Sequence, residues 1–336
     1  MQPNNLAHNE LPYQEVDFRS FEKGELHVHL NGLVSTETIK EILEAENLVL
    51  PVGFNCDTDL NHLVPCASLE DYLKPWNVLN LIPNQRMNLT ALVEDAFVAL
   101  NSDRISFVEL RNSVLYLSKN LGVSVEQSMQ WLIDDISFMQ YKYGIKAGLI
   151  LTVSRSPFAK QNLEHLLTAY KEIGCPELVR GLDLAGNEDV EIDKSISQLF
   201  VQAKEKYGLG ITIHAGETGS LQNIVEAIEL FRADRIGHGT AASKNQGIME
   251  ILREKDICVE VCPISNKLTN AVKVSEAHPM RAFLEHDVPF VICSDNPAIH
   301  KKSLSDDYSS AFSETKSMEM LKHMFNKQKK YSFISL

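Results

Sequence analysis

The sequence is poor in positive charge. Its 336 residues include 32 lysines and arginines against 45 aspartates and glutamates, which gives a formal net charge of −13. This is the wrong sign for a protein that grips the phosphate backbone of a polynucleotide, so we predict no nucleic-acid partner. A small ligand is not excluded, because the charge of one pocket can differ from the average of the chain.

Long apolar runs and paired cysteines are also missing. The longest apolar stretches, such as 148–153 and 288–293, are strand-sized and far short of the ~20 residues that cross a bilayer, so we predict no membrane partner. The first 20 residues are polar and acidic, unlike a secretory signal. The six cysteines contain no CxxC pair, as expected for free thiols in a reducing compartment. We therefore expect a cytoplasmic protein.

Short segments rich in Val, Ile and Leu recur along the chain and alternate with segments of helical spacing. The eight expected strands are 25–30, 106–110, 146–153, 179–185, 210–214, 235–237, 258–261 and 289–294. Apolar residues at 196, 199, 200, 203 and 207 predict a helix that ends at Gly208. This alternation predicts an α/β protein with a parallel sheet. A closed (β/α)8 barrel of the TIM type and an open doubly wound sheet both fit the pattern.

The interval after the first strand is too long for one crossover helix. It spans 76 positions, from residue 30 to residue 106, and has helical candidates at 36–46, 69–81 and 89–100. Because this helical excursion (31–105) leaves the carboxyl end of a strand, we expect it to lie over the mouth of a barrel. Some of its apolar residues either line a pocket or pack the excursion onto the barrel: Trp76, Leu79, Leu81 and Ile82. The basic tail 322–330 is expected to be a solvated terminal helix.

Histidines and a carboxylate fall at strand ends. His27 and His29 are two apart on the first expected strand, so both face one side of the sheet. His214 ends the fifth strand, His238 follows the sixth, and Asp295 follows the eighth. A single histidine is more often a core residue than a ligand. Together these nitrogen and carboxylate groups predict a site for Zn²⁺ or a related metal.

Glu217 follows His214 by three residues in the segment HAGE. A carboxyl group beside a metal can give or take a proton during catalysis. The alternative is that Glu217 simply begins the next helix.

Six motifs together resemble those of the adenosine deaminase family of the amidohydrolase superfamily. They are HVHLNG (27–32), GLDLAGNE (181–188), HAGETGS (214–220), RIGHGT (235–240), CPISN (262–266) and SDNP (294–297). The resemblance runs from about residue 21 to residue 308 and implies a (β/α)8 barrel. We therefore expect one domain, 1–336, with the excursion 31–105 over its active-site mouth.

The resemblance also implies a reaction. The expected enzyme is a zinc-dependent aminohydrolase that converts a 6-aminopurine nucleoside, most simply adenosine or 2′-deoxyadenosine, to inosine or 2′-deoxyinosine with release of ammonia. One Zn²⁺ per chain would be held by His27, His29, His214 and Asp295.

The same resemblance assigns the other roles. Glu217 would protonate purine N1, His238 would orient and help to deprotonate the attacking water, and Asp295 could accept a proton from that water. The expected substrate-binding residues are His29, Asn31, Gly186 and Asn296, with the backbone N–H of Gly186 donating to N3.

Two positions depart from the family's usual pattern. Asn31 stands where an aspartate commonly accepts a hydrogen bond from the ribose 5′-hydroxyl, and Asn296 stands where a second aspartate faces N7. An amide can still donate to N7. The neutral Asn31 would admit a 5′-phosphate, and relatives that act on N6-methyl-AMP also carry HLNG. Three basic residues either meet such an anionic tail or form ion pairs: Arg111, Arg155 and Lys267.

Several alternatives stay open at this stage. The substrate could be adenine or a 5′- or N6-modified nucleoside or nucleotide. A binuclear hydrolase would need a lysine carbamate or carboxylate near the end of the fourth strand, but residues 184–187 read LAGN and the nearest downstream lysine is Lys194. A catalytically inactive adenosine-binding relative is disfavoured by the intact set of ligands, Glu217 and His238. The sequence makes no prediction of oligomeric state.

Overall fold

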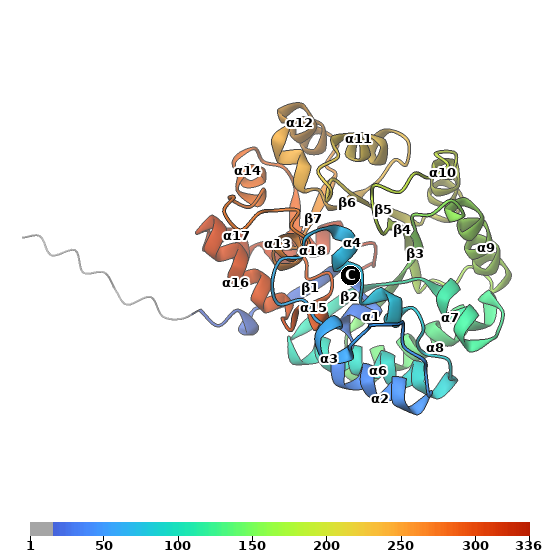
Figure 1. The fold of residues 1–336 in the computed structure, drawn as a ribbon. Coiled ribbons are helices and arrows are strands. Elements are labelled where there is room, and N and C mark those ends of the chain that lie inside the picture. The colour runs from blue at the N-terminus through green and yellow to red at the C-terminus, as the bar shows by residue number, and fades with distance from the viewer. Residues whose placement is uncertain (1–15) are drawn as a thin grey trace, which may run out of the picture.

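Eight parallel strands form one sheet in the computed structural model, which describes residues 16–336 (Figure 1). Their order in the sheet is their order in the chain. The strands are β1 (Lys23–His29), β2 (Ile105–Asn112), β3 (Lys146–Ser154), β4 (Val179–Ala185), β5 (Gly210–Ala215), β6 (Arg235–His238), β7 (Cys258–Val261) and β8 (Phe290–Ile292). Sequential order excludes the doubly wound sheet, whose strand order reverses.

The sheet closes between β1 and the residues that follow β8. Val28 forms a parallel bridge with Asp295, the His29 N–H donates to the Asp295 carbonyl (3.0 Å), and the Asp295 N–H donates to the His27 carbonyl (2.8 Å). This closure confirms the predicted (β/α)8 barrel. It also sets Asp295 directly beside the two histidines of β1.

All eight predicted strands exist, and six of them have shifted ends. The prediction for β4 and β7 was right to the residue, whereas β8 is shorter than the expected 289–294. The helix α10 (Ile196–Tyr207) ends before Gly208, as predicted. Gly208 has a left-handed φ of 68°, which is typical of a glycine that follows a helix.

Helices surround the barrel and bury its outer face. Phe97, Phe200 and Phe283 are fully buried between helices and strands. The remaining elements are η1 (Phe18–Ser20), α1 (Leu30–Leu33), α2 (Thr36–Ala45), α3 (Cys56–Asp59), α4 (Leu69–Tyr72), α5 (Trp76–Leu79), α6 (Arg86–Ser102), α7 (Val114–Leu121), α8 (Val125–Tyr143), α9 (Ala159–Glu172), α11 (Leu221–Glu229), η2 (Thr240–Lys244), α12 (Gln246–Glu254), α13 (Pro263–Leu268), α14 (Met280–Glu285), α15 (Pro297–His300), α16 (Leu304–Thr315), α17 (Met318–Lys322) and α18 (Met324–Tyr331).

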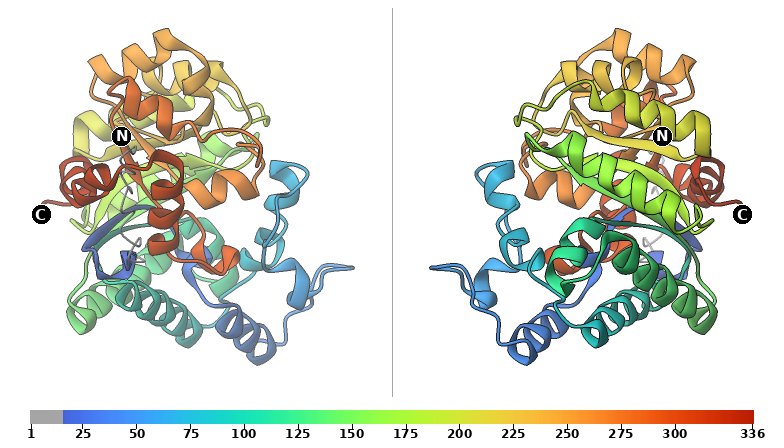
Figure 2. Two further views of the ribbon diagram at one scale, coloured as in Figure 1. Left: turned by 90° about the vertical axis from the view of Figure 1, so that its left-hand side faces the viewer. Right: turned by 90° about the vertical axis from the view of Figure 1, so that its right-hand side faces the viewer.

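The segment between β1 and β2 is helical, as expected. The helices predicted at 36–46 and 89–100 correspond to α2 and α6, but the one predicted at 69–81 was wrong. It is split into α4 and α5 at Pro75, which lacks an N–H for the helical ladder and disfavours helical backbone at the residue before it. The light-blue part of this segment stands out from one end of the barrel (Figure 2).

The C-terminal helix α18 packs against β1 and β8, so the prediction of a solvated terminal helix was wrong for one of its faces. Gln328 is fully buried; its Nε2 donates to the Ile292 carbonyl (3.0 Å) and its Oε1 accepts from the Gly24 N–H (2.9 Å). Only the other face, with Lys329 and Lys330, is exposed. The pattern of charges along a helix does not show that the Gln328 amide faces two backbone groups that need a hydrogen-bond partner.

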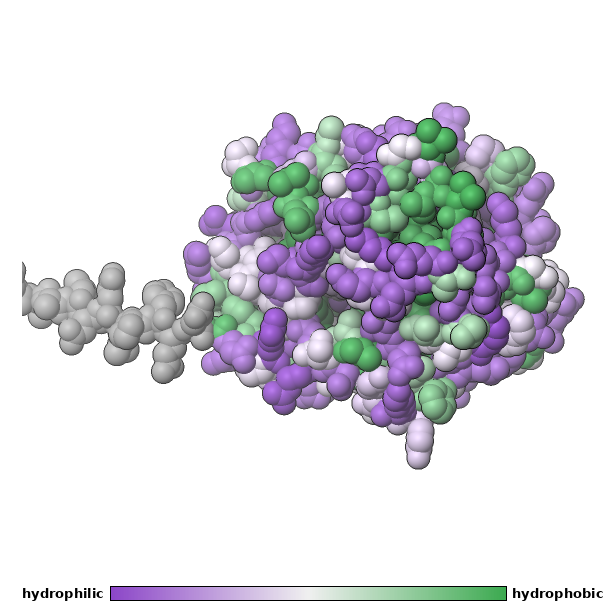
Figure 3. Space-filling model, turned by 60° about the horizontal axis from the view of Figure 1, so that its bottom comes forward, coloured by the Kyte–Doolittle hydropathy of each residue, from purple (hydrophilic) through white to green (hydrophobic). Residues whose placement is uncertain are grey.

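The surface in Figure 3 is mostly hydrophilic, with separate apolar areas. No helix within residues 16–336 combines the length and the apolar character needed to span a membrane.

Candidate active site

Four potential metal ligands meet at the carboxyl end of the barrel. His27 and His29 come from β1, His214 from β5, and Asp295 from the end of β8; each offers one donor atom, and these atoms lie within 4.8 Å of one another. The Asp295 Oδ1 atom is 3.5 Å from His29 Nε2 and 3.7 Å from His27 Nε2. Among residues 16–336, this is the single group of three or more such side chains arranged to hold an ion.

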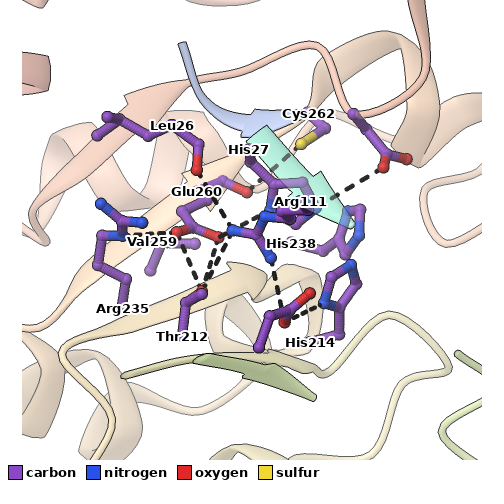
Figure 4. Close-up of polar contacts among 12 residues, drawn as sticks. Leu26, His27, Arg111, Thr212, His214, Arg235, His238, Val259, Glu260 and Cys262 are labelled. Carbon is purple, nitrogen blue, oxygen red and sulfur yellow. Dashed lines mark hydrogen bonds and ion pairs between the residues drawn. The ribbon is translucent and has the colours of Figure 1, made fainter. Parts of the chain in front are cut away.

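Buried carboxylates orient two of these rings. Glu260 lies 2.7 Å from Nδ1 of His27, and Asp183 lies 2.9 Å from Nδ1 of His214 (Figure 4). Each carboxylate accepts the Nδ1–H, which leaves the Nε2 lone pair free for a ligand. His27 Nε2 is buried and has no hydrogen-bond partner among the described residues. A donor set of three imidazoles and one carboxylate with an unpaired buried nitrogen fits a first-row divalent metal.

Arg111 connects the two carboxylates. Its Nη2 lies 2.5 Å from Glu260 and its Nη1 lies 3.1 Å from Asp183, and all three side chains are fully buried. Arg235 forms a further ion pair with Glu260, at 2.6 Å. Sequence reasoning missed Glu260 and Asp183 as supports for the rings. A signal was present, because a charged residue in the middle of an otherwise apolar strand points into a barrel that must neutralise it.

Glu217 is buried beside the four potential ligands, with its Oε2 atom 3.8 Å from His238 Nε2. Burial raises the pKa of Glu217 well above its ordinary value, and the nearby Asp295 and Glu188 carboxylates raise it further. The carboxyl group therefore favours its protonated form. It can serve as a proton donor to a ligand in this site.

Glu188 fixes the turn that carries Glu217. Its two oxygens accept from the backbone N–H groups of Gly216 (2.8 Å) and Glu217 (2.6 Å), and the Asn223 amide donates to it as well (2.9 Å). Glu188 is the last residue of the motif GLDLAGNE, but the sequence analysis predicted no role for it. The structure makes it the anchor of Glu217.

A chain of hydrogen bonds determines which nitrogen of His238 carries a proton. The Met280 N–H donates to His278 Nδ1 (3.2 Å), so the proton of His278 is on Nε2, which faces the Asn266 Oδ1 (3.2 Å). The Asn266 amide then donates from Nδ2 to His238 Nδ1 (3.0 Å). Burial keeps the pKa of His238 well below its ordinary value. The neutral ring thus presents Nε2–H toward the site.

A cavity of about 230 Å³ lies between these groups and the excursion. The candidate substrate-binding residues His29, Asn31, Gly186 and Asn296 all line it. Trp76 and Ile82 do so too, together with Tyr72, which sequence reasoning missed. Leu79 is fully buried and does not line the cavity, which matches the alternative that it packs the excursion onto the barrel.

The basic residues near the mouth are already paired. Arg111 is held by Glu260 and Asp183, the Arg155 guanidinium donates to the His214 carbonyl (2.9 Å), and Lys267 pairs with Glu314 (2.6 Å). The sequence left open whether these residues meet an anionic tail of the substrate or form structural pairs, and the geometry supports the structural pairs. Among the described residues that line the cavity, no cation is free to meet a phosphate.

A barrel that gathers three imidazoles, a carboxylate and a buried glutamic acid of raised pKa at its carboxyl end is typical of metal-dependent hydrolases. A family model described as Adenosine deaminase matches residues 22–335. The chain belongs to the adenosine deaminase family and is an aminohydrolase enzyme.

Named relatives agree with this membership. An adenosine deaminase of Clostridium botulinum is 31% identical over 309 residues, covering 91% of this chain and 89% of the relative. One of Clostridium kluyveri is 32% identical over 292 residues, covering 85% and 82%.

Solved structures share the fold. An adenine deaminase from Arthrobacter aurescens aligns with a TM-score of 0.82 at 20% identity over 93% of this chain and 94% of its own. A zinc-bound amidohydrolase from Burkholderia ambifaria gives 0.84 at 17% identity (98% and 91%). The N6-mAMP deaminase of Arabidopsis gives 0.77 at 21% identity (95% and 95%). At these identities the likeness concerns the fold alone.

Proposed function

We propose that the enzyme hydrolyses the 6-amino group of a purine nucleoside, with adenosine and 2′-deoxyadenosine as substrates. Water replaces the amino group at C6, so inosine or 2′-deoxyinosine and ammonia are the products. The observation that carries this proposal is the meeting of four potential metal ligands with the buried carboxyl group of Glu217 in one covered cavity. All six cysteines are free, which supports a cytoplasmic location.

We assign one Zn²⁺ per chain to His27, His29, His214 and Asp295. The donor chemistry and the unpaired Nε2 of His27 support this ion. When bound, it would make a water molecule acidic enough to act as a nucleophile near neutral pH.

The protein groups around the ion supply the proton transfers. Glu217 in its acid form donates to N1 of the purine, which draws electrons from C6 and makes that carbon more electrophilic. His238 directs its Nε2–H toward the attacking oxygen and orients it. Because its Nδ1 already accepts from Asn266, the neutral ring has no lone pair left for the deprotonation expected of it from the resemblance, so we assign the proton that the water loses to Asp295 alone. The water oxygen bonds to C6, the amino group takes the proton held by Asp295 and leaves as ammonia when the C6–N bond breaks, and the hydroxyl proton returns to Glu217 as the C6=O group forms.

The order of the strands supports our assignment of the purine edges. Glu217 and Gly186 follow the neighbouring strands β5 and β4, whereas Asn296 follows β8 on the far side of the barrel. With Glu217 at N1, we therefore assign the Gly186 N–H to N3 and Asn296 to N7. We assign His29 to the side of the reacting carbon and Asn31 to the sugar.

Nucleosides are favoured over nucleotides as substrates. Asn31 carries no charge that would repel a phosphate, but the lining residues within 16–336 include no free cation to bind one. The adenosine deaminase relatives at 31–32% identity support the same choice. Adenine and N6-methyl-AMP remain the second candidates, because an adenine deaminase and an N6-mAMP deaminase share the fold.

A panel of 6-aminopurines tests the proposal directly. Adenosine, 2′-deoxyadenosine, adenine, AMP and N6-methyl-AMP would be followed by the spectral change from amino to oxo purine and by ammonia release. We expect turnover of the two nucleosides by protein that holds one zinc per chain. Inert nucleosides beside active nucleotides or adenine would overturn the choice of substrate.

The variant Glu217→Gln tests the role of the acid. It keeps the shape of the side chain but cannot donate the proton, so we expect kcat to fall by at least ~10²-fold with zinc content unchanged. The exposed Glu191→Gln is the matched control and should behave as wild type. An active Glu217→Gln enzyme would refute the assignment.

A further inference from the structure

Tyr72 ties the excursion to the end of β8. It belongs to α4, its side chain is buried, and it lines the cavity. Its hydroxyl lies 2.7 Å from Nε2 of His300, 3.0 Å from Nδ2 of Asn296 and 3.3 Å from Oδ2 of Asp295. One phenol group thus touches three polar side chains that come from a distant part of the chain.

The direction of each hydrogen bond follows from what the groups can offer. His300 is buried and its Nδ1 has no partner among the described residues, so a proton there would be an unpaired buried donor. Its proton therefore lies on Nε2 and is donated to the Tyr72 oxygen. The Asn296 amide donates to the same oxygen, which fills both lone pairs. The Tyr72 O–H is left to donate to Asp295.

This arrangement fixes the side-chain amide of Asn296. Its Oδ1 is buried without a partner, on the side of Gly32, where an added Cβ would come within 2.0 Å of it. Its Nδ2 is on the side of Tyr72, which lines the cavity. If the amide turned over, its Nδ2 would take the buried position where Oδ1 now has no partner, and a buried N–H without an acceptor is rarer than a buried C=O without a donor. The edge of Asn296 toward the cavity is therefore its N–H edge.

We propose that Tyr72 is a specificity-determining residue that holds Asn296 as a hydrogen-bond donor toward the ligand. A free asparagine amide can donate or accept, so it does not by itself select between a ligand acceptor and a ligand donor. With its orientation fixed by Tyr72, Asn296 selects an acceptor, which in a purine placed as described above is N7. The inference rests on the proposed function, because that function places the five-membered ring at Asn296.

The test compares adenosine with 7-deazaadenosine, in which a C–H replaces the N7 acceptor. For the wild-type enzyme we expect kcat/KM to fall by about 10- to 100-fold on this replacement, since a buried donor is left unpaired. The variant Tyr72→Phe keeps the ring and removes the hydroxyl, so the amide can turn over. We expect the ratio of kcat/KM for adenosine to kcat/KM for 7-deazaadenosine to be at least ~5-fold lower in this variant than in the wild type.

This ratio separates the effect of the Asn296 orientation from a general loss of activity toward both substrates. Loss of the hydrogen bond to Asp295 slows both substrates alike and cancels in the ratio, whereas the orientation of Asn296 affects only the substrate with N7. Tyr116→Phe, which alters another tyrosine of the cavity lining, is the matched control and should keep the wild-type ratio. In Asn296→Ala, the added Tyr72→Phe change should leave the ratio where Asn296→Ala alone puts it.

The outcomes separate this inference from the proposed function. An active Tyr72→Phe enzyme with the wild-type ratio overturns the role of Tyr72 and leaves the deaminase assignment standing. A wild-type enzyme that turns over no 6-aminopurine overturns the proposed function, and the inference with it. A lowered ratio in Tyr72→Phe that is absent in the Asn296→Ala background supports both.

Discussion

The carboxylate of Asp183 lies 2.9 Å from Nδ1 of His214 beneath the four potential metal ligands. Burial favours the neutral acid, but His214 and Arg111 keep the pKa of Asp183 below its ordinary value. The ionised carboxylate therefore accepts the Nδ1–H and leaves Nε2 of His214 for a ligand. The ring is oriented before any ion arrives.

Asp183→Asn should weaken metal binding. The amide is a poorer acceptor for the His214 ring and leaves Arg111 with one fewer charged partner, so we expect metal affinity to fall about 10- to 100-fold. Competition with a chelator measures it. The exposed Asp134→Asn should bind metal as the wild type does. Equal affinities in the two variants would contradict the orienting role.

Glu188→Gln should impair Glu217 without touching the metal. One acceptor of the two backbone N–H groups is lost, so we expect kcat to fall about tenfold. The charge of Glu188 also helps to raise the pKa of Glu217, after burial and Asp295. The alkaline limb of the pH–rate profile, where Glu217 loses its proton, should therefore move to lower pH. An unshifted limb would speak against this coupling, and Glu191→Gln is the control.

Asn31→Asp should loosen the excursion. The Asn31 amide donates to the Leu79 carbonyl (2.8 Å), and its oxygen accepts from Asn112 (3.4 Å). A carboxylate would repel the carbonyl, so we expect faster hydrogen exchange in α5. The exposed Asn101→Asp carries the same change of charge and should leave this exchange unchanged. Unchanged exchange in Asn31→Asp would show that this contact does not hold the excursion.

Gln328→Ala should destabilise the packing of α18 against β1 and β8. It leaves the Gly24 N–H and the Ile292 carbonyl buried and unpaired, so we expect the free energy of unfolding to drop by about 3 kcal/mol. Urea unfolding measures this change. The exposed Gln202→Ala should stay within about 0.5 kcal/mol of the wild type. A change as small as this in Gln328→Ala would mean that these two hydrogen bonds do not stabilise the barrel.

His278 should make stability depend on pH. Burial lowers its pKa to about 3, whereas the unfolded chain titrates near 6.5. Between these values the unfolded state binds one more proton, so the free energy of unfolding falls as pH falls, by up to ~1.4 kcal/mol per unit. Below pH 6, the free energy of unfolding of His278→Gln should depend on pH less steeply than that of the wild type, by this amount per unit. The exposed His165→Gln should keep the wild-type slope. Parallel curves for wild type and His278→Gln would refute it.

Local patterns were enough to predict the eight strands and the histidines and aspartate at their ends, whereas the choice of a barrel and of the four potential metal ligands came from the resemblance to the family. Alternation along β1 puts His27 and His29 on one face, and the carboxyl ends of parallel strands converge, so residues that end different strands must meet. These are consequences of backbone periodicity, which one sequence displays directly. The same patterns missed the split at Pro75 and the buried amide of Gln328.

The supports of the site depend on contacts between residues far apart in the chain. Glu260 and His27 are separated by 233 positions, and Tyr72 and Asn296 by 224. No spacing rule relates such pairs, because their approach follows only from barrel closure and from the path of the excursion. Residue types and strand periods therefore indicated the chemistry of the site. The packed structure decided which carboxylate orients each ring and which hydroxyl holds each amide, because a buried hydrogen bond needs both partners within about 3 Å.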